Sequence, residues 1–169
     1  LALGGVGEFG SNLSLYGYSD KWLMVDCGLS FAEKSMPGID ILVPDTEFID
    51  NQVDKLIGLV LTHAHEDHLG AIPYIWHKIK CPVYATKYTA TILRNKLDDA
   101  GIVDKIKIRI VDSLNPISIG PFDVRYLPVS HSIIEANSLA IKTPAGLIFH
   151  SGDWKIDDDP CIGFKTEES

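Results

Sequence analysis

The sequence predicts a layered α/β fold in a single domain. Short apolar runs rich in β-branched residues occur near both ends of the chain and are typical of buried strands. Helix-like segments lie between them, which is the pattern expected when helices pack against the faces of sheets. The chain has 169 residues, of which 46% are hydrophobic, and this is enough to fill one core.

Each element follows from the local pattern of apolar and turn-forming residues. Strands are expected at residues 13–18, 22–27, 58–61, 83–85, 106–111, 116–119, 122–127, 138–142 and 147–150. Helices are expected at residues 47–53, 68–78 and 87–100. Asp67 stands where the N-cap of the second helix belongs, and Pro73 inside that helix predicts a kink or a later start.

The segment Thr-His-Ala-His-Glu-Asp-His at residues 62–68 carries most of the chemical information in the chain. It follows the apolar run at residues 56–61 and so leaves the end of a predicted strand. If the backbone stays extended there, His63 and His65 point to the same side, and Asp67 and His68 open the next element. Two pairs of ligands from one turn would suit two adjacent metal ions. The alternative, a polar loop with histidines placed by chance, is weakened because three of the six histidines fall in this turn.

Two further candidate ligands stand at the ends of later predicted strands. His131 follows the alternating segment 122–127, and Asp153 follows the segment 147–150. A catalytic zinc takes nitrogen and oxygen ligands and keeps one position open for water. Either residue alone would more often be structural. Their order after the first motif, each at the end of a strand, favours one shared site.

This order of residues resembles that of the metallo-β-lactamase superfamily, whose fold is an αβ/βα sandwich. Carried over by position, the resemblance implies that His63, His65 and His131 bind one metal. It implies that Asp67 and His68 bind a second metal, with Asp153 as the bridging carboxylate. Asp67 and Asp153 are then also the expected catalytic residues, and Asp67 is expected to orient the attacking hydroxide.

Further motifs narrow the resemblance to the ribonuclease J family, in the β-CASP branch of the superfamily. In chain order they are LGGVGEFGSN at residues 3–12, VDCG at 25–28, PGIDILVPD at 37–45, PVYAT at 82–86 and HSGDWK at 150–155. The match runs over nearly the whole chain. It implies that residues 1–169 form the first, incomplete portion of a metallo-β-lactamase domain. The β-CASP insert and the C-terminal portion of the domain are expected outside this chain.

The resemblance implies a metal-dependent ribonuclease for RNA processing and decay, which cuts RNA internally and also degrades it from the 5′ end. Two divalent metal ions, Zn²⁺ or alternatively Mn²⁺, would activate the hydroxide that attacks the phosphodiester. The alternative function is a small-molecule hydrolase of the same superfamily, of the thioesterase or lactonase type. Because the family takes a further histidine ligand from beyond the insert, the chain alone is expected to bind at most one metal tightly and to be inactive.

Two other features allow more than one interpretation. Gly5, Gly7 and Gly10 fit the dinucleotide-binding pattern G-x-G-x-x-G, but a strand-like segment follows them instead of a helix. They are therefore expected to let the backbone turn tightly beside the floor of the site. Asp26, at the end of a predicted strand, either supports the metal ligands or forms a turn before Gly28.

Composition limits the class of protein. The net charge of −8 argues against a broad basic face on this chain. The resemblance implies that an RNA substrate is held between this domain and the β-CASP insert. No apolar run is long enough to span a membrane, and no signal-peptide pattern is present. The three cysteines form neither a C-x-x-C site nor a disulfide framework, which fits a cytoplasmic location. For the full-length protein, assembly into a homo-oligomer is left open.

Overall fold

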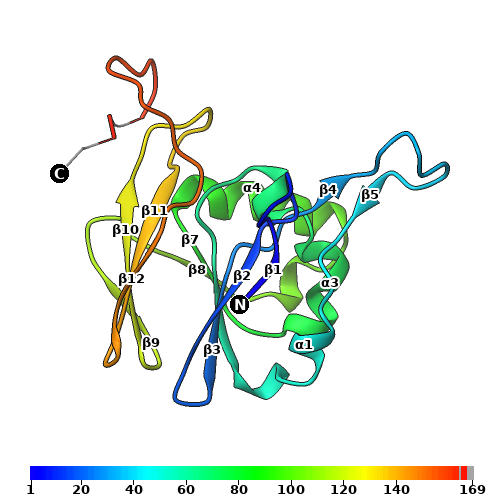
Figure 1. The fold of residues 1–169 in the computed structure, drawn as a ribbon, viewed down its shortest axis with the longest axis horizontal. Helices are drawn as coiled ribbons and strands as arrows, with labels where there is room; N and C mark the ends of the chain where they lie inside the picture. The colour runs from blue at the N-terminus through cyan, green and yellow to red at the C-terminus, as the bar shows by residue number, and fades with distance from the viewer. Residues whose placement is uncertain (164, 167–169) are drawn as a thin grey trace.

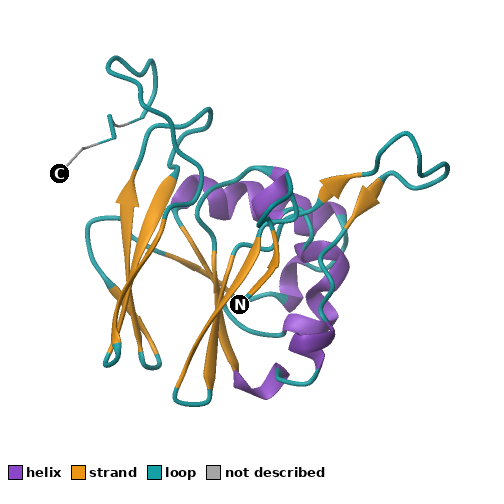
Figure 2. Ribbon diagram, in the orientation of Figure 1, coloured by secondary structure: helices purple, strands orange, loops and turns teal. Residues whose placement is uncertain are grey.

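Two sheets and one layer of helices build the fold, as the computed structural model shows for residues 1–163, 165 and 166 (Figures 1 and 2). The strands are β1 (Ala2–Gly4), β2 (Leu13–Tyr18), β3 (Lys21–Val25), β4 (Ser30–Phe31), β5 (Ile41–Leu42), β6 (Leu56–Val60), β7 (Val83–Ala85), β8 (Ile108–Ile110), β9 (Ile117–Ile119), β10 (Phe122–Pro128), β11 (Asn137–Thr143) and β12 (Gly146–His150). The helices are α1 (Glu47–Asp50), α2 (Glu66–Leu69), α3 (Ile72–Ile79) and α4 (Lys87–Asp99), with short 3-10 turns η1 (Val53–Lys55) and η2 (Val103–Lys105).

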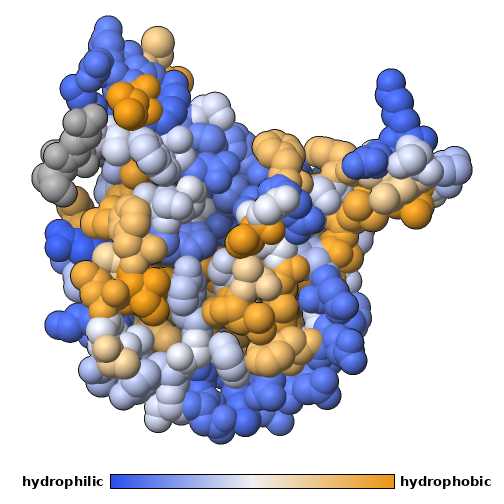
Figure 3. Space-filling model, in the orientation of Figure 1, coloured by the Kyte–Doolittle hydropathy of each residue, from blue (hydrophilic) through white to orange (hydrophobic). Residues whose placement is uncertain are grey.

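The larger sheet has the strand order β1-β2-β3-β6-β7-β8. Its first three strands are antiparallel, and β3, β6, β7 and β8 are parallel to one another. The smaller sheet is antiparallel, with the order β12-β11-β10-β9. The hairpin β4-β5 projects from the body, and Figure 3 shows hydrophobic side chains along it. Phe31 in β4 and Ile39 just before β5 are both exposed.

Two apolar layers hold the sheets and helices together. Leu23 and Val25 of β3 belong to the layer between the two sheets, whereas Met24 between them belongs to the layer under the helices. This alternation is expected because successive side chains of a strand point to opposite faces. Across the layer between the sheets, the Tyr126 hydroxyl donates a hydrogen bond to the main-chain oxygen of Tyr84 at 3.1 Å.

The helices cover only the outer face of the larger sheet (Figure 2). In α3 the buried residues Ile72, Ile75 and Ile79 lie on one side of the helix, which gives it an apolar stripe facing the sheet. In α4 the stripe includes Leu93 and Leu97. In the described part of the chain, no helix has both the length and the apolar character needed to cross a membrane.

The ends of several strands meet at one edge of the fold. Because β3 and β6 are parallel, the residues that follow them, Asp26 and Thr62, lie side by side. In the smaller sheet β10 leads to His131 and β12 leads to Asp153. The candidate site forms at this edge, where strand ends of both sheets meet.

The nine strands expected from sequence are all present, with bounds shifted by at most two residues. The prediction for the second helix was partly wrong. A separate short helix, α2, already begins at Glu66. The later start that Pro73 predicted is found in α3, which begins at Ile72 with Pro73 in its first turn. Asp67 is therefore not the N-cap. That position belongs to His65, whose backbone is extended and whose carbonyl accepts the amides of His68 and Leu69, each at 3.0 Å.

The layer between the sheets makes a testable prediction about β-strand faces. Phe122 is fully buried there, whereas Phe149 of the same sheet is 65% exposed on the opposite face. We expect Phe122→Ala to lower the free energy of unfolding by about 3–5 kcal/mol, since it leaves a cavity. Phe149→Ala, the control, should change it by less than about 0.5 kcal/mol. Urea denaturation of both variants measures the difference, and equal losses would contradict the assignment of the faces.

Candidate metal centre

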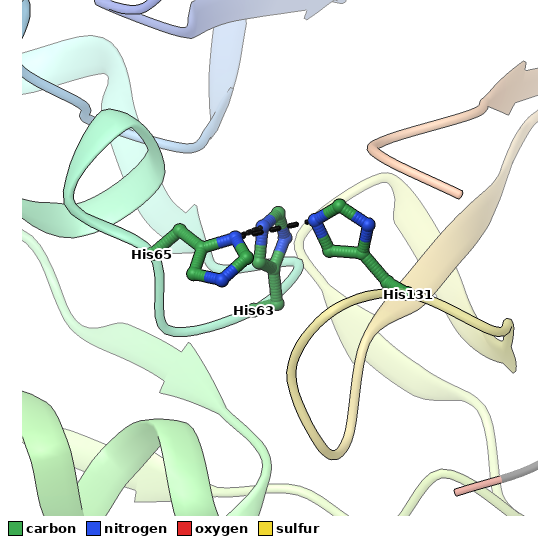
Figure 4. Close-up of side chains that lie close together, drawn as sticks. All are labelled: His63, His65 and His131. Atoms are coloured by element: carbon green, nitrogen blue, oxygen red, sulfur yellow. Dashed lines mark hydrogen bonds between the residues drawn. The ribbon is translucent and has the colours of Figure 1, made fainter. Parts of the chain in front are cut away.

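Three histidines from the two sheets converge at the common edge (Figure 4). His63 and His65 come from the loop after β6, and His131 comes from the loop after β10. Nδ1 of His65 lies 3.0 Å from Nε2 of His63 and 3.2 Å from Nε2 of His131. One nitrogen of each ring lies within 4.8 Å of the others, a spacing that suits one shared cation.

A second group of side chains adjoins the first. Ligand atoms of His63, His68 and Asp153 also lie within 4.8 Å of one another. Oδ2 of Asp153 is 3.4 Å from Nε2 of His68 and 3.7 Å from Nε2 of His131, so this carboxylate lies between the two groups. Oδ2 of Asp67 is 3.5 Å from Nε2 of His68. The structure thus brings together all six residues that the sequence pointed to.

The buried carboxylate of Asp26 holds Thr62 and His68 in place through hydrogen bonds. Its Oδ1 accepts the Thr62 amide, and its Oδ2 accepts both the Thr62 hydroxyl and Nδ1 of His68, each at 2.8 Å. Of the two interpretations of Asp26, the contacts fit the one in which it holds a histidine. With Nδ1 occupied in this way, Nε2 of His68 faces the centre of the site.

Thr62 positions His63 in a similar way, although the sequence motif alone did not indicate this role. Its hydroxyl proton goes to Asp26, so its oxygen is free to accept the Nδ1 hydrogen of His63, 3.0 Å away. Nε2 of His63 is then left with its lone pair toward His65. The available signal was a hydroxyl residue directly before the first histidine of the motif.

Close packing of backbone fixes the position of the loop. A Cβ added to Gly28 would lie 1.6 Å from the carbonyl oxygen of Asp67 and 2.7 Å from the His68 nitrogen. No larger residue fits, and the amide of Cys27 also donates to the His68 carbonyl at 2.7 Å. The segment after β3 is therefore in direct backbone contact with the two candidate ligands.

The protonation states follow from burial and from the carboxylates. Burial lowers the pKa of His63 to about 3 and also lowers the pKa of His131, so both rings are neutral. For His68 burial acts in the same direction, but the carboxylates of Asp26, Asp153 and Asp67 outweigh it and raise its pKa to about 12. Hydrogen bonding to His68 lowers the pKa of Asp153 to about 2.

This donor set fits a divalent metal ion. The carboxylates of Asp26, Asp153 and Asp67 raise the pKa of His68, so a proton on this ring is favoured and the potential at this position is negative. A cation in the place of that proton would be stabilised by the same charges. Neutral imidazoles beside ionised carboxylates are the ligands that zinc and related metals take in catalytic sites.

The two remaining histidines, His150 and His77, lie outside the cluster. Nδ1 of His150 is 2.8 Å from the Tyr16 hydroxyl, a contact that joins β12 to β2 across the two sheets. His77 is exposed on α3. Among the residues that the structure describes, neither belongs to a group of side chains close enough to share a cation.

The fold and this cluster define a class of protein, and the comparison with known families agrees. The model of the beta-lactamase superfamily domain matches residues 21–164. The chain therefore belongs to the beta-lactamase superfamily, and its fold is an α/β arrangement consistent with part of the expected sandwich.

Within the superfamily, the chain is similar to ribonuclease J over its whole length. It is 44% identical to ribonuclease J of Sinorhizobium meliloti, over 100% of the chain and 31% of that protein. It is 38% identical to the Helicobacter pylori enzyme, over 98% of the chain and 24% of that protein. The chain thus spans about a quarter to a third of the length of these relatives. The resemblance read from the sequence motifs is confirmed as a similarity along the whole chain.

Solved structures support the fold. The metallo-beta-lactamase fold protein YhfI from Bacillus subtilis aligns with a TM-score of 0.65 at 19% identity, over 92% of this chain and 60% of that one. Zn²⁺-bound PqqB from Methylobacterium extorquens aligns with a TM-score of 0.57 at 11% identity, over 82% of this chain and 51% of that one. At such low identities the likeness concerns the fold alone.

The support from Asp26 predicts how metal affinity responds to its loss. Asp26→Asn keeps the shape but removes the charge and one acceptor, so His68 is no longer held with Nε2 facing the site. We expect affinity for Zn²⁺ to fall about 10–100-fold. Titration calorimetry measures this, with Asp123→Asn, at an exposed position of β10, as the control. Unchanged affinity in Asp26→Asn would contradict the supporting role.

Proposed function

We propose that this chain is the metal-binding part of a metal-dependent ribonuclease of the ribonuclease J type, which hydrolyses RNA phosphodiesters. The observation that carries the proposal is the coincidence of two findings. The similarity to ribonuclease J extends over the entire chain, and the six candidate ligands that the similarity implies converge on one edge of the fold. We propose that the protein acts both within RNA and from its 5′ end.

In this proposal the centre holds two divalent metal ions. His63, His65 and His131 hold one, Asp67 and His68 hold the other, and Asp153 lies between them. We favour Zn²⁺ because nitrogen ligands dominate the first group, with Mn²⁺ as the alternative for phosphoryl chemistry. When bound, such metals activate water and neutralise charge on a phosphate.

The residues of the chain have separate tasks in this scheme. The neutral rings of His63 and His131 offer lone pairs without prior loss of a proton. Asp67 and Asp153 are only partly buried, so their carboxylates are in reach of a substrate and of water. We assign Asp67 to the orientation of the attacking water. Asp26 and Thr62 touch no substrate in this scheme and position the histidines.

Removing a ligand tests the RNA-cleaving activity in the full-length protein. His65→Ala or Asp67→Ala should reduce metal-dependent RNA cleavage below about 1% of the wild-type rate, since each removes a direct ligand. The matched control is His77→Ala, because His77 is exposed and remote from the cluster. Cleavage of a 5′-monophosphorylated RNA, with circular dichroism to monitor folding, gives the comparison.

Two results would contradict this proposal. One is wild-type cleavage in either folded ligand variant. The other is a purified wild-type protein that hydrolyses thioesters or lactones and leaves RNA intact, which would favour a small-molecule hydrolase of the same superfamily. Removal of metal with a chelator should abolish RNA cleavage, and added Zn²⁺ or Mn²⁺ should restore it.

We further propose that residues 1–169 form the first portion of the metallo-β-lactamase domain, whose second metal site takes another ligand from outside this chain. In the chain itself, the Asp67–His68 group offers one ligand fewer than the group of His63, His65 and His131. We expect calorimetric titration of the isolated chain with Zn²⁺ to show at most one tight site. Two tight sites per chain, with cleavage at the full-length rate, would show that the chain is self-sufficient.

A further inference from the structure

The side chain of Asn12 lies against the Asp67–His68 half of the metal centre. Its Nδ2 donates to the carbonyl oxygen of Asp67 at 3.0 Å and is 3.3 Å from Oδ2 of the same residue. The same nitrogen is 3.1 Å from Nε2 of His68. Asn12 therefore contacts both candidate ligands at the atoms that would face a cation.

The backbone of Asn12 is fixed to the same two segments. Its amide donates to the Asp67 carbonyl at 3.0 Å, so that carbonyl accepts from both the main chain and the side chain of one residue. Its carbonyl accepts the amide of Gly28 at 2.9 Å. Asn12 is thus clamped between the end of β3 and the first turn of α2, and its side chain has little freedom to move away.

The glycine-rich segment before Asn12 leaves space for this side chain. Gly5 has φ +80, and a Cβ at Gly5 would lie 2.3 Å from Oδ1 of Asn12. Gly7 has nearly the same backbone, φ +79, but a Cβ there would meet nothing within 4 Å. The positive φ angle favours glycine at both positions. Only at Gly5 would a larger residue also collide with the side chain of Asn12.

We propose that Asn12 is a positioning residue of the metal centre, whose amide orients Asp67 and His68 toward one cation. Helix α2 has only four residues, so its own hydrogen bonds constrain Asp67 weakly. A donor on Oδ2 restricts rotation of the carboxylate, and the packed amide limits tilting of the His68 ring. The inference rests on the proposed metal site and adds to it a residue that binds no metal itself.

The first test compares two asparagine variants in the full-length protein by calorimetric titration with Zn²⁺. Asn12→Ala should weaken the Asp67–His68 site about 10–100-fold and leave the affinity of the three-histidine site unchanged. Asn51→Ala is the control, because Asn51 is exposed and its side-chain amide, among the described residues, donates only to the Glu47 carbonyl. In absorption spectra of the Co²⁺-loaded proteins, Asn12→Ala should change the signal of the Asp67–His68 site and leave that of the three-histidine site unchanged.

The second test separates displacement of Asn12 from backbone strain. Gly5→Ala and Gly7→Ala impose the same strain, but only Gly5→Ala places a methyl group where the Asn12 side chain lies. We expect Gly5→Ala to weaken the second site as Asn12→Ala does, and Gly7→Ala to leave it intact. Equal effects of the two glycine variants, or wild-type binding in Asn12→Ala, would overturn the role of Asn12 alone. Absence of any Zn²⁺ binding in the wild-type protein would overturn the metal centre and this inference together.

Discussion

The carboxylate of Asp26 is the contact on which the rest of the site depends. A charge buried this completely is costly unless donors surround it, and here the Thr62 amide, the Thr62 hydroxyl and His68 supply three hydrogen bonds. Asp26 adopts φ +59, a strained conformation for a residue with a Cβ, while its own amide binds the Val60 carbonyl at 2.9 Å. One side chain thereby fixes the ends of β3 and β6 and the first turn of α2 relative to one another.

The candidate ligands come from both sheets, and this has a thermodynamic consequence. His63, His65 and His68 follow β6 of the larger sheet, whereas His131 and Asp153 follow strands of the smaller one. A cation held by both sets would link the sheets at their open edge. The free energy of metal binding would then add to the stability that the apolar layer between the sheets provides. Metal binding and folding would therefore be coupled.

The sequence allowed the strand ends and the convergence of six candidate ligands to be predicted, because strand periodicity is local and these residues follow the strands directly. Three kinds of feature were not accessible in this way. Strands such as β4 and β5 have two residues each and carry no periodicity. The short helix α2 was not expected as a separate element, and its residues Asp67 and His68 pack against Gly28, which is distant in sequence. The role of Asn12 depends on contacts with residues 55 and 56 positions away.

The negative charge of the chain becomes intelligible once the site is included. Three carboxylates, those of Asp26, Asp67 and Asp153, are concentrated around His68 at the candidate metal site. Under the two-metal proposal, two divalent cations would offset half of the net charge of −8 and place positive charge where a phosphate must approach. Recognition would then begin at the metal centre and not at a basic face of this chain. If residues 1–169 are one portion of a longer protein, as proposed above, a broad electrostatic surface for the RNA backbone is expected on the other portion.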